Sequence, residues 1–167
     1  MHDRLTKSDI EKMQKEIEHR KLVVRKESIE AVKEARAQGD LSENFEYYAA
    51  KRDKNKNESR IRYLENMIKT AQVIDEDSHP DQVGMNNTVV VFSERTQKEM
   101  TYRIVTTVRA KPLKGLISIE SPIGKAVYMR RVGERVHVDT GNGEGYDVVI
   151  RSIEKTEDDS ADTISSY

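Results

Sequence analysis

A single short break, at Gly39, separates two long charged runs in the first half of the chain. Neither run contains glycine or proline before or after that break. Glycine readily adopts the positive φ that ends a helix, and Asp40 or Ser42 can cap the helix that follows. We therefore expect two long helices joined by a tight turn, and this turn carries two carboxylates, Asp40 and Glu43.

Apolar residues recur within these runs at spacings typical of a coiled coil. In the first run, from about residue 8 to 38, Ser8 and Glu11 have the spacing of a capping box. The heptad positions that follow are Ile10, Met13, Ile17, Val24 and Ala31, interrupted by Arg20 and Glu27. In the second run, from about residue 43 to 74, the apolar positions are Ile61, Leu64, Ile68 and Ala71. We expect a seam that is more apolar away from Gly39 than near it.

The pattern changes at Thr88 to short runs of β-branched and aromatic residues, which predict strands. The expected strands cover residues 89–92, 101–106, 117–120, 135–138 and 146–150. Pro122 suits a first helical position and predicts one short helix over residues 122–129. The expected fold class is α+β with two domains. A coiled-coil hairpin covers residues 1–76, a linker 77–87, a small antiparallel sheet with one helix 88–155, and an acidic flexible tail 156–167.

Composition excludes several classes of protein. The chain has no cysteine, which rules out disulfides and thiolate metal sites, and its net charge of −1 provides no overall field for nucleic acid. No run approaches about 18 apolar residues, and the first residues lack the apolar core of a signal peptide. We expect a cytoplasmic protein that does not contact a membrane.

The two carboxylates of the turn allow two interpretations. As caps, Asp40 and Glu43 satisfy backbone amides at the start of the second helix and suit its dipole. As ligands, they bind a divalent ion together with another protein, because two carboxylates are too few to hold octahedral Mg²⁺ alone. Local spacing does not separate these interpretations.

Basic residues follow the turn. Residues 51–62 carry six basic and two acidic side chains, and Arg52, Lys56 and Arg60 recur every four residues, so they are expected on one helix face. That face is either solvated or a patch for the nucleic-acid backbone. Tyr47 either stacks on a base or packs against the facing helix.

The stretch from Glu34 to Lys51 resembles the signature of the Gre family of bacterial transcript-cleavage factors, of GreA type. Residues 60–75 and 117–126 also match, so the resemblance covers nearly the whole chain before the tail. One departure is Phe45, which stands where the family usually has alanine. The resemblance implies that the second domain is FKBP-like.

The resemblance also implies bacterial RNA polymerase as the partner, with the globular domain at the rim of its secondary channel and the hairpin turn at its catalytic centre. There Asp40 helps to hold a Mg²⁺ ion shared with the polymerase, and Glu43 helps to orient the attacking water on the 3′ end of backtracked RNA. The isolated protein is then expected to be a monomer that holds no metal and catalyses nothing alone. Expected contacts with RNA or polymerase are Arg36, Tyr47, Lys51, Arg52 and Lys56, and expected docking residues are Ser121, Pro122, Ile123 and Gly124.

Two other functions compete with transcript cleavage. A regulator could occupy the same channel and inhibit transcription without promoting cleavage, although the Asp40 and Glu43 pair argues against this. An FKBP-like domain could also be a peptidyl-prolyl isomerase. That activity needs an aromatic-lined pocket, and the second half offers only Phe92, Tyr102, Tyr128, Tyr146 and Tyr167.

Overall fold

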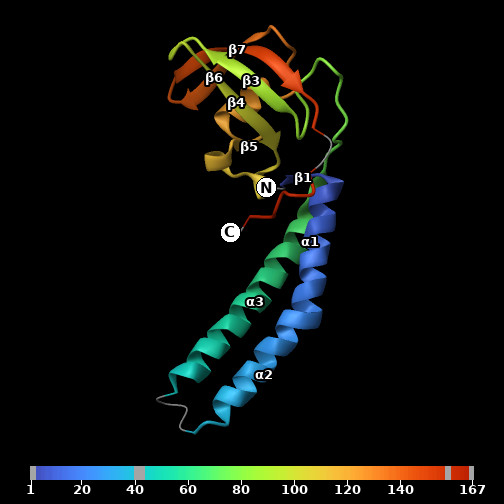
Figure 1. Cartoon of the computed structure of the whole chain (residues 1–167), viewed down its shortest axis with the longest axis vertical. Coiled ribbons are helices and arrows are strands. Elements are labelled where there is room, and N and C mark those ends of the chain that lie inside the picture. The colour runs from blue at the N-terminus through green and yellow to red at the C-terminus, as the bar shows by residue number, and fades with distance from the viewer. Residues whose placement is uncertain (1–2, 40–43, 157–158, 166–167) are drawn as a thin grey trace. The chain divides into compact units, whose positions relative to one another are not determined.

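A computed structural model of the chain describes residues 3–39, 44–156 and 159–165 (Figure 1). These residues form two compact units. One is a helical hairpin, Ile10–Ala71, and the other joins Asp3–Asp9 to the described residues from Gln72 onward. The predicted α+β class with two domains is confirmed.

The hairpin pairs one long helical stretch with a second helix that runs beside it (Figure 1). Helix α1 (Lys7–His19) passes through a π-helical segment, Arg20–Val24, into α2 (Arg25–Arg36). Helix α3 spans Phe45–Thr70. Both predicted helices are confirmed, although α3 is shorter at each end than the apolar pattern indicated.

The π-helical segment moves the buried stripe of the first helix by one position. A π-helix bonds residue i to residue i+5, so it needs one more residue to complete a turn than an α-helix does. Ala31 is exposed, whereas Val32 is half-buried and Ala35 is 5% exposed. The heptad prediction is therefore wrong beyond Val24, because it assumed an uninterrupted α-helical period.

Polar side chains fill the middle of the hairpin. Arg20 donates a hydrogen bond to the Asn57 side chain at 3.0 Å, and Arg60 donates to the Glu16 carboxylate at 2.8 Å. Burial raises the pKa of Glu16, but hydrogen bonds from Arg60 and Arg20 outweigh it and hold the pKa below its usual value. Cross-helix hydrogen bonds therefore take the place of apolar contacts here.

The second unit is built on a five-stranded sheet in the order β5-β4-β3-β7-β6. The strands are β3 (Thr88–Ser93), β4 (Lys98–Val105), β5 (Leu116–Ser118), β6 (Arg135–Gly141) and β7 (Glu144–Glu154). Neighbours are antiparallel except β4 and β5, which are parallel. The sheet is thus mixed, and the prediction of an antiparallel sheet is wrong for the pair β4 and β5. Two 3₁₀ turns, Thr107–Arg109 and Pro112–Lys114, lie between β4 and β5 and return the chain, so that β5 runs in the same direction as β4. The short helix α4 (Pro122–Val127) follows β5.

A second, smaller sheet belongs to the same unit. Strand β1 (Arg4–Leu5) pairs in parallel with β2 (Gln72–Val73), which comes directly after α3. The division between the units therefore precedes β2 and does not fall after residue 76.

The stretch predicted as a linker contributes to the apolar core. Val83 is 0% and Met85 2% exposed, and both belong to the core under the large sheet. The Met129 amide donates to the Val83 carbonyl at 2.8 Å, and the Asn86 amide donates to the Ile104 carbonyl at 2.7 Å. The linker prediction is wrong here, because two isolated apolar residues among polar ones give no periodic signal.

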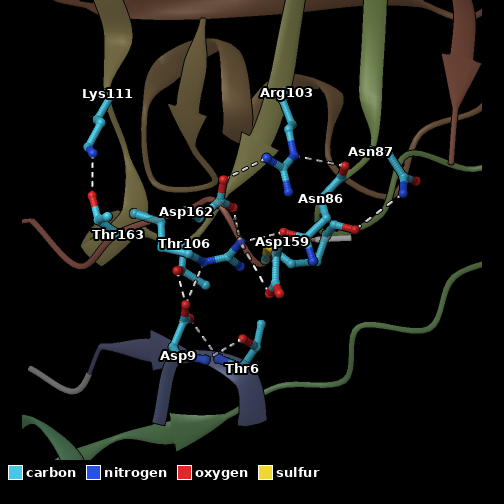
Figure 2. A network of polar contacts seen from close by, with 12 residues as sticks. Thr6, Asp9, Asn86, Asn87, Arg103, Thr106, Lys111, Asp159, Asp162 and Thr163 are labelled. Atoms are coloured by element: carbon cyan, nitrogen blue, oxygen red, sulfur yellow. Dashed lines mark hydrogen bonds and ion pairs between the residues drawn. The ribbon is translucent and has the colours of Figure 1, made fainter. Parts of the chain in front are cut away.

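A buried network of charges joins the first and last described segments of this unit (Figure 2). The Arg109 side chain is fully buried. Its Nε donates to Asp9 Oδ1 at 2.5 Å, and its Nη1 donates to Asn86 Oδ1 at 2.6 Å and to Asp162 Oδ2 at 2.9 Å. The guanidinium is therefore hydrogen-bonded to the carboxylates of Asp9 and Asp162, and Asp159 Oδ2 lies 3.8 Å from its Nη1.

Asp9 also fixes the start of α1. The Thr6 amide donates to Asp9 Oδ2 at 3.0 Å, and the Asp9 amide donates to Thr6 Oγ1 at 3.1 Å. This is a capping box. It replaces the predicted one at Ser8 and Glu11, because α1 already begins at Lys7.

The end of the chain contacts the sheet domain. Asp162 accepts a second hydrogen bond from Arg103 at 2.8 Å, and the Ser165 amide donates to the Val108 carbonyl at 2.6 Å. The expectation of a flexible acidic tail is corrected for residues 159–165, because the Asp162 side chain is 6% exposed and pairs with the buried Arg109 and the half-buried Arg103.

Candidate functional site at the hairpin turn

The turn of the hairpin is described only on its two sides. Residues 40–43, which include Asp40, Ser42 and Glu43, lie outside the described residues. Gly39 has the expected positive φ, 122°, after the end of α2. The geometry of this site is therefore given by the residues on either side of the turn, 36–39 and 44–51.

Asn44 joins the ends of the two helices. Its Oδ1 accepts a hydrogen bond from the Tyr47 amide at 3.0 Å, which caps α3. Its Nδ2 donates to the Ala35 carbonyl in the last turn of α2 at 2.5 Å. The prediction that Asp40 or Ser42 caps α3 is therefore wrong, because α3 begins later, at Phe45, and the residue before it is itself a good N-cap.

The substitution Asn44→Ala should lower the free energy of unfolding by about 1 kcal/mol, because it removes the N-cap of α3. Thermal unfolding followed by circular dichroism at the helical band measures this effect. The matched control is Asn55→Ala, which makes the same chemical change at an exposed position inside α3. Equal stability of the two variants would contradict the capping role.

Tyr47 contacts the facing helix. The Arg36 guanidinium of α2 lies 5.7 Å from the centre of the Tyr47 ring. A hydrogen bond from Arg36, followed by the charge of Lys51, holds the pKa of the Tyr47 phenol below its usual value. Of the two interpretations of Tyr47, packing against the facing helix is the one that the contacts support.

Three of the predicted basic residues are exposed on α3. They are Lys51, Arg52 and Lys56. Arg60, expected on the same face, is only 8% exposed and pairs with Glu16. The basic face is therefore shorter than the spacing indicated, because the hairpin interior uses one of its arginines.

The predicted docking residues lie at the start of α4. Ser121 Oγ accepts from the Gly124 amide at 3.1 Å and caps the helix, and Ile123 is 8% exposed. Pro122 is exposed. Ile123 and Gly124 are thus buried, and of these four residues only Ser121 and Pro122 have side chains that reach the surface.

A cleft of about 490 Å³ opens beside Pro122. It is lined by Pro122, Lys125, Ala126, Arg130, Arg135, Val136, His137 and Asp139. Three of these residues are basic, and none is phenylalanine, tyrosine or tryptophan, so the cleft lacks the aromatic walls expected of a prolyl isomerase.

Within residues 3–39, 44–156 and 159–165, no three histidine or acidic side chains lie close enough together to hold a metal ion. The same residues include no helix that is long and apolar enough to cross a membrane.

Comparisons with known proteins agree on one family. The profile "Transcription elongation factor, N-terminal" matches residues 4–73, and "Transcription elongation factor, GreA/GreB, C-term" matches residues 77–155. Transcription elongation factor GreA of Geobacillus kaustophilus is 47% identical over 141 residues, covering 84% of this chain and 89% of that protein. GreA of Caldanaerobacter subterraneus is 46% identical over 140 residues, covering 83% and 89%. Among solved structures, the transcription factor Gfh1 has a TM-score of 0.45 at 24% identity, covering 92% of this chain and 97% of that chain.

Proposed function

Because the chain belongs to the GreA/GreB family of transcription elongation factors, we propose that it stimulates cleavage of backtracked RNA by bacterial RNA polymerase. The helical hairpin enters the secondary channel of the polymerase, and its turn reaches the catalytic centre. Removal of the displaced RNA 3′ end then returns an arrested complex to synthesis.

The observation that carries this proposal is the cap at Asn44. Asn44 occupies the N-cap position of α3, so the roles proposed for Asp40 and Glu43 do not compete with that position. The length of the hairpin also supports the proposal. The 26 residues of α3 span about 39 Å at a rise of 1.5 Å per residue, which suits insertion into a deep channel.

Asp40 and Glu43 are the proposed chemical groups of the turn. Their oxygen atoms suit Mg²⁺, which prefers carboxylates and retains water ligands, and two of them fit an ion whose other ligands come from the polymerase. Bound Mg²⁺ supplies an activated water and stabilises the leaving oxygen. In this proposal Asp40 contributes a ligand oxygen, and Glu43 accepts a hydrogen bond from the attacking water and so orients it.

Two other parts of the chain hold the complex together in this proposal. The exposed basic residues Arg36, Lys51, Arg52 and Lys56 face phosphate groups of RNA or acidic groups of the polymerase. Ser121 and Pro122, beside the basic cleft, dock on the channel rim.

Substitution of either carboxylate tests the function. We expect Asp40→Ala and Glu43→Ala to reduce stimulated cleavage by at least about 10–100-fold, the range found when even the hydrogen-bonding partners of metal ligands are removed. The assay adds the protein with Mg²⁺ to stalled, backtracked polymerase and follows release of short 3′ RNA fragments.

The matched control is Glu46→Ala, which removes an exposed acid from the first turn of α3 and should leave cleavage unchanged. Co-sedimentation with polymerase checks that every variant still binds. Cleavage by both Asp40→Ala and Glu43→Ala at the parent rate would refute the roles of these residues. Binding of the parent without any cleavage would instead identify an inhibitory channel regulator.

A further inference from the structure

An aromatic residue stands exposed beside the turn. Phe45, the first residue of α3, is 85% exposed, and Tyr48, three positions later on the same side of the helix, is 46% exposed. One exposed apolar side chain is ordinary in a soluble protein. Here two exposed rings lie one helical turn apart at the end of a hairpin, and the charges near them indicate what they bind.

The Tyr48 ring is held in place by its neighbours. Tyr47 and Tyr48 meet edge to face, with ring centres 5.5 Å apart and planes at 64°. Tyr47 is in turn fixed by the Arg36 guanidinium across the hairpin. Tyr48 is therefore supported from within the hairpin and is still 46% exposed.

Exposed cations lie just beyond this aromatic pair, and the exposed acid Glu46 lies between its two members. Arg36, Lys51 and Arg52 are all exposed near the start of α3 or the end of α2. Exposed rings flanked by cations are the arrangement that binds single-stranded nucleic acid, because any base can stack on a ring while the phosphates meet the cations. An apolar pocket of a protein partner would not require the flanking cations.

We propose that Phe45, with Tyr48 one helical turn further along α3, stacks on an unpaired base near the 3′ end of the backtracked RNA and positions it for cleavage. The inference rests on the proposed function, and it assigns Phe45 a positioning role separate from that of the two carboxylates. Unpaired bases of RNA are recognised in this way, by stacking on aromatic side chains. The interaction does not depend on the identity of the base.

Three substitutions of Phe45 distinguish stacking from simple apolar contact. At subsaturating protein, Phe45→Ala should slow cleavage by about 5–150-fold, the range that corresponds to loss of one stacked base. Phe45→Leu keeps an apolar side chain without a π-face and should lose nearly as much. Phe45→Tyr keeps the ring and should cleave at the parent rate. Because Phe45 is exposed, none of these changes should alter thermal unfolding.

Removing the base from the RNA completes a double-mutant cycle with Phe45→Ala. On RNA with an abasic 3′ nucleotide, the parent and Phe45→Ala should cleave at the same reduced rate. A full effect of Phe45→Ala on the abasic RNA, or parent-like cleavage by Phe45→Leu, would overturn the proposal. The latter result would point to an apolar contact with the polymerase.

A direct measurement separates this inference from the proposed function. RNA with 2-aminopurine at its 3′ end should lose fluorescence when the cleavage-deficient Asp40→Ala protein binds the backtracked complex. The same experiment with Asp40→Ala and Phe45→Ala combined should show no loss. Equal quenching by both proteins, or quenching by neither, would refute the stacking role, whether or not the parent stimulates cleavage.

Discussion

Replacing Arg109 with methionine should lower the free energy of unfolding by about 3–5 kcal/mol, because it leaves the buried Asp9 carboxylate without its cation. Methionine fills similar space, so the effect comes from charge more than from a cavity. Asp9 and Arg109 are both fully buried, and water cannot replace the lost partner. Urea unfolding followed by tyrosine fluorescence measures the change.

A second substitution tests the cause of this destabilisation. Adding Asp9→Asn to Arg109→Met removes the stranded charge and should restore part of the lost stability. The surface control is Asp81→Asn, which breaks an exposed pair with Arg131 and should cost at most about 1 kcal/mol. The buried-charge explanation is wrong if Arg109→Met is as mild as this control, or if the double variant is the less stable of the two.

Gly124→Ala should cost about 3 kcal/mol, at the upper end of the range for overpacking. A Cβ atom at this position would lie 2.0 Å from the Ser118 carbonyl oxygen and 2.9 Å from Ser121 Oγ. The obstacle is the backbone at the end of β5, which cannot rotate away as a side chain does. Helix α4 would have to move off the sheet.

Gly133→Ala serves as the control for Gly124→Ala. A Cβ atom there meets nothing within 4 Å, but φ is 89°, so the expected cost is the conformational one of about 1–2 kcal/mol. Chemical unfolding of both variants measures the difference. A loss at Gly124 no greater than at Gly133 would mean that α4 adjusts freely. If Gly124→Ala then still bound polymerase less well, the loss would come from a direct contact between α4 and the polymerase and not from a displaced helix.

Regular elements could be predicted from the sequence because their signals are periodic. The strands around Val89 and Ile104 and the helix at Pro122 follow from β-branched runs and from a proline at a first helical position. The two hairpin helices follow from long runs without glycine or proline. In each case the sequence signal that predicts the helix or strand lies within the residues that form it.

The remaining features depend on contacts between distant residues. The Arg109 network joins residues about 50 and 100 positions away, and Val83 enters the core without a strand of its own. The one-residue shift from Ala31 to Val32 depends on a π-helical segment that no residue type marks. Each of these contacts is set by tertiary structure, which a local pattern does not contain.

The candidate site divides in the same way. The sequence motif predicts Asp40 and Glu43, which lie outside the described residues, so their assignment stays a prediction. Asn44 was identifiable in principle, since asparagine is among the preferred N-caps, but Asp40 and Ser42 offered equally good caps closer to Gly39. The exposure of Phe45 could not be read from its residue type, because phenylalanine is more often buried.

The charge network sets an order of events during protein synthesis. The hairpin unit is complete once residue 71 has left the ribosome, whereas Arg109 waits for Asp162, which is 53 residues later. At about 5–20 residues per second this interval lasts about 3–10 s. Through that interval the arginine has only one of its two hydrogen-bonded carboxylates, so the sheet unit of the nascent chain completes its interior only after Asp162 has emerged.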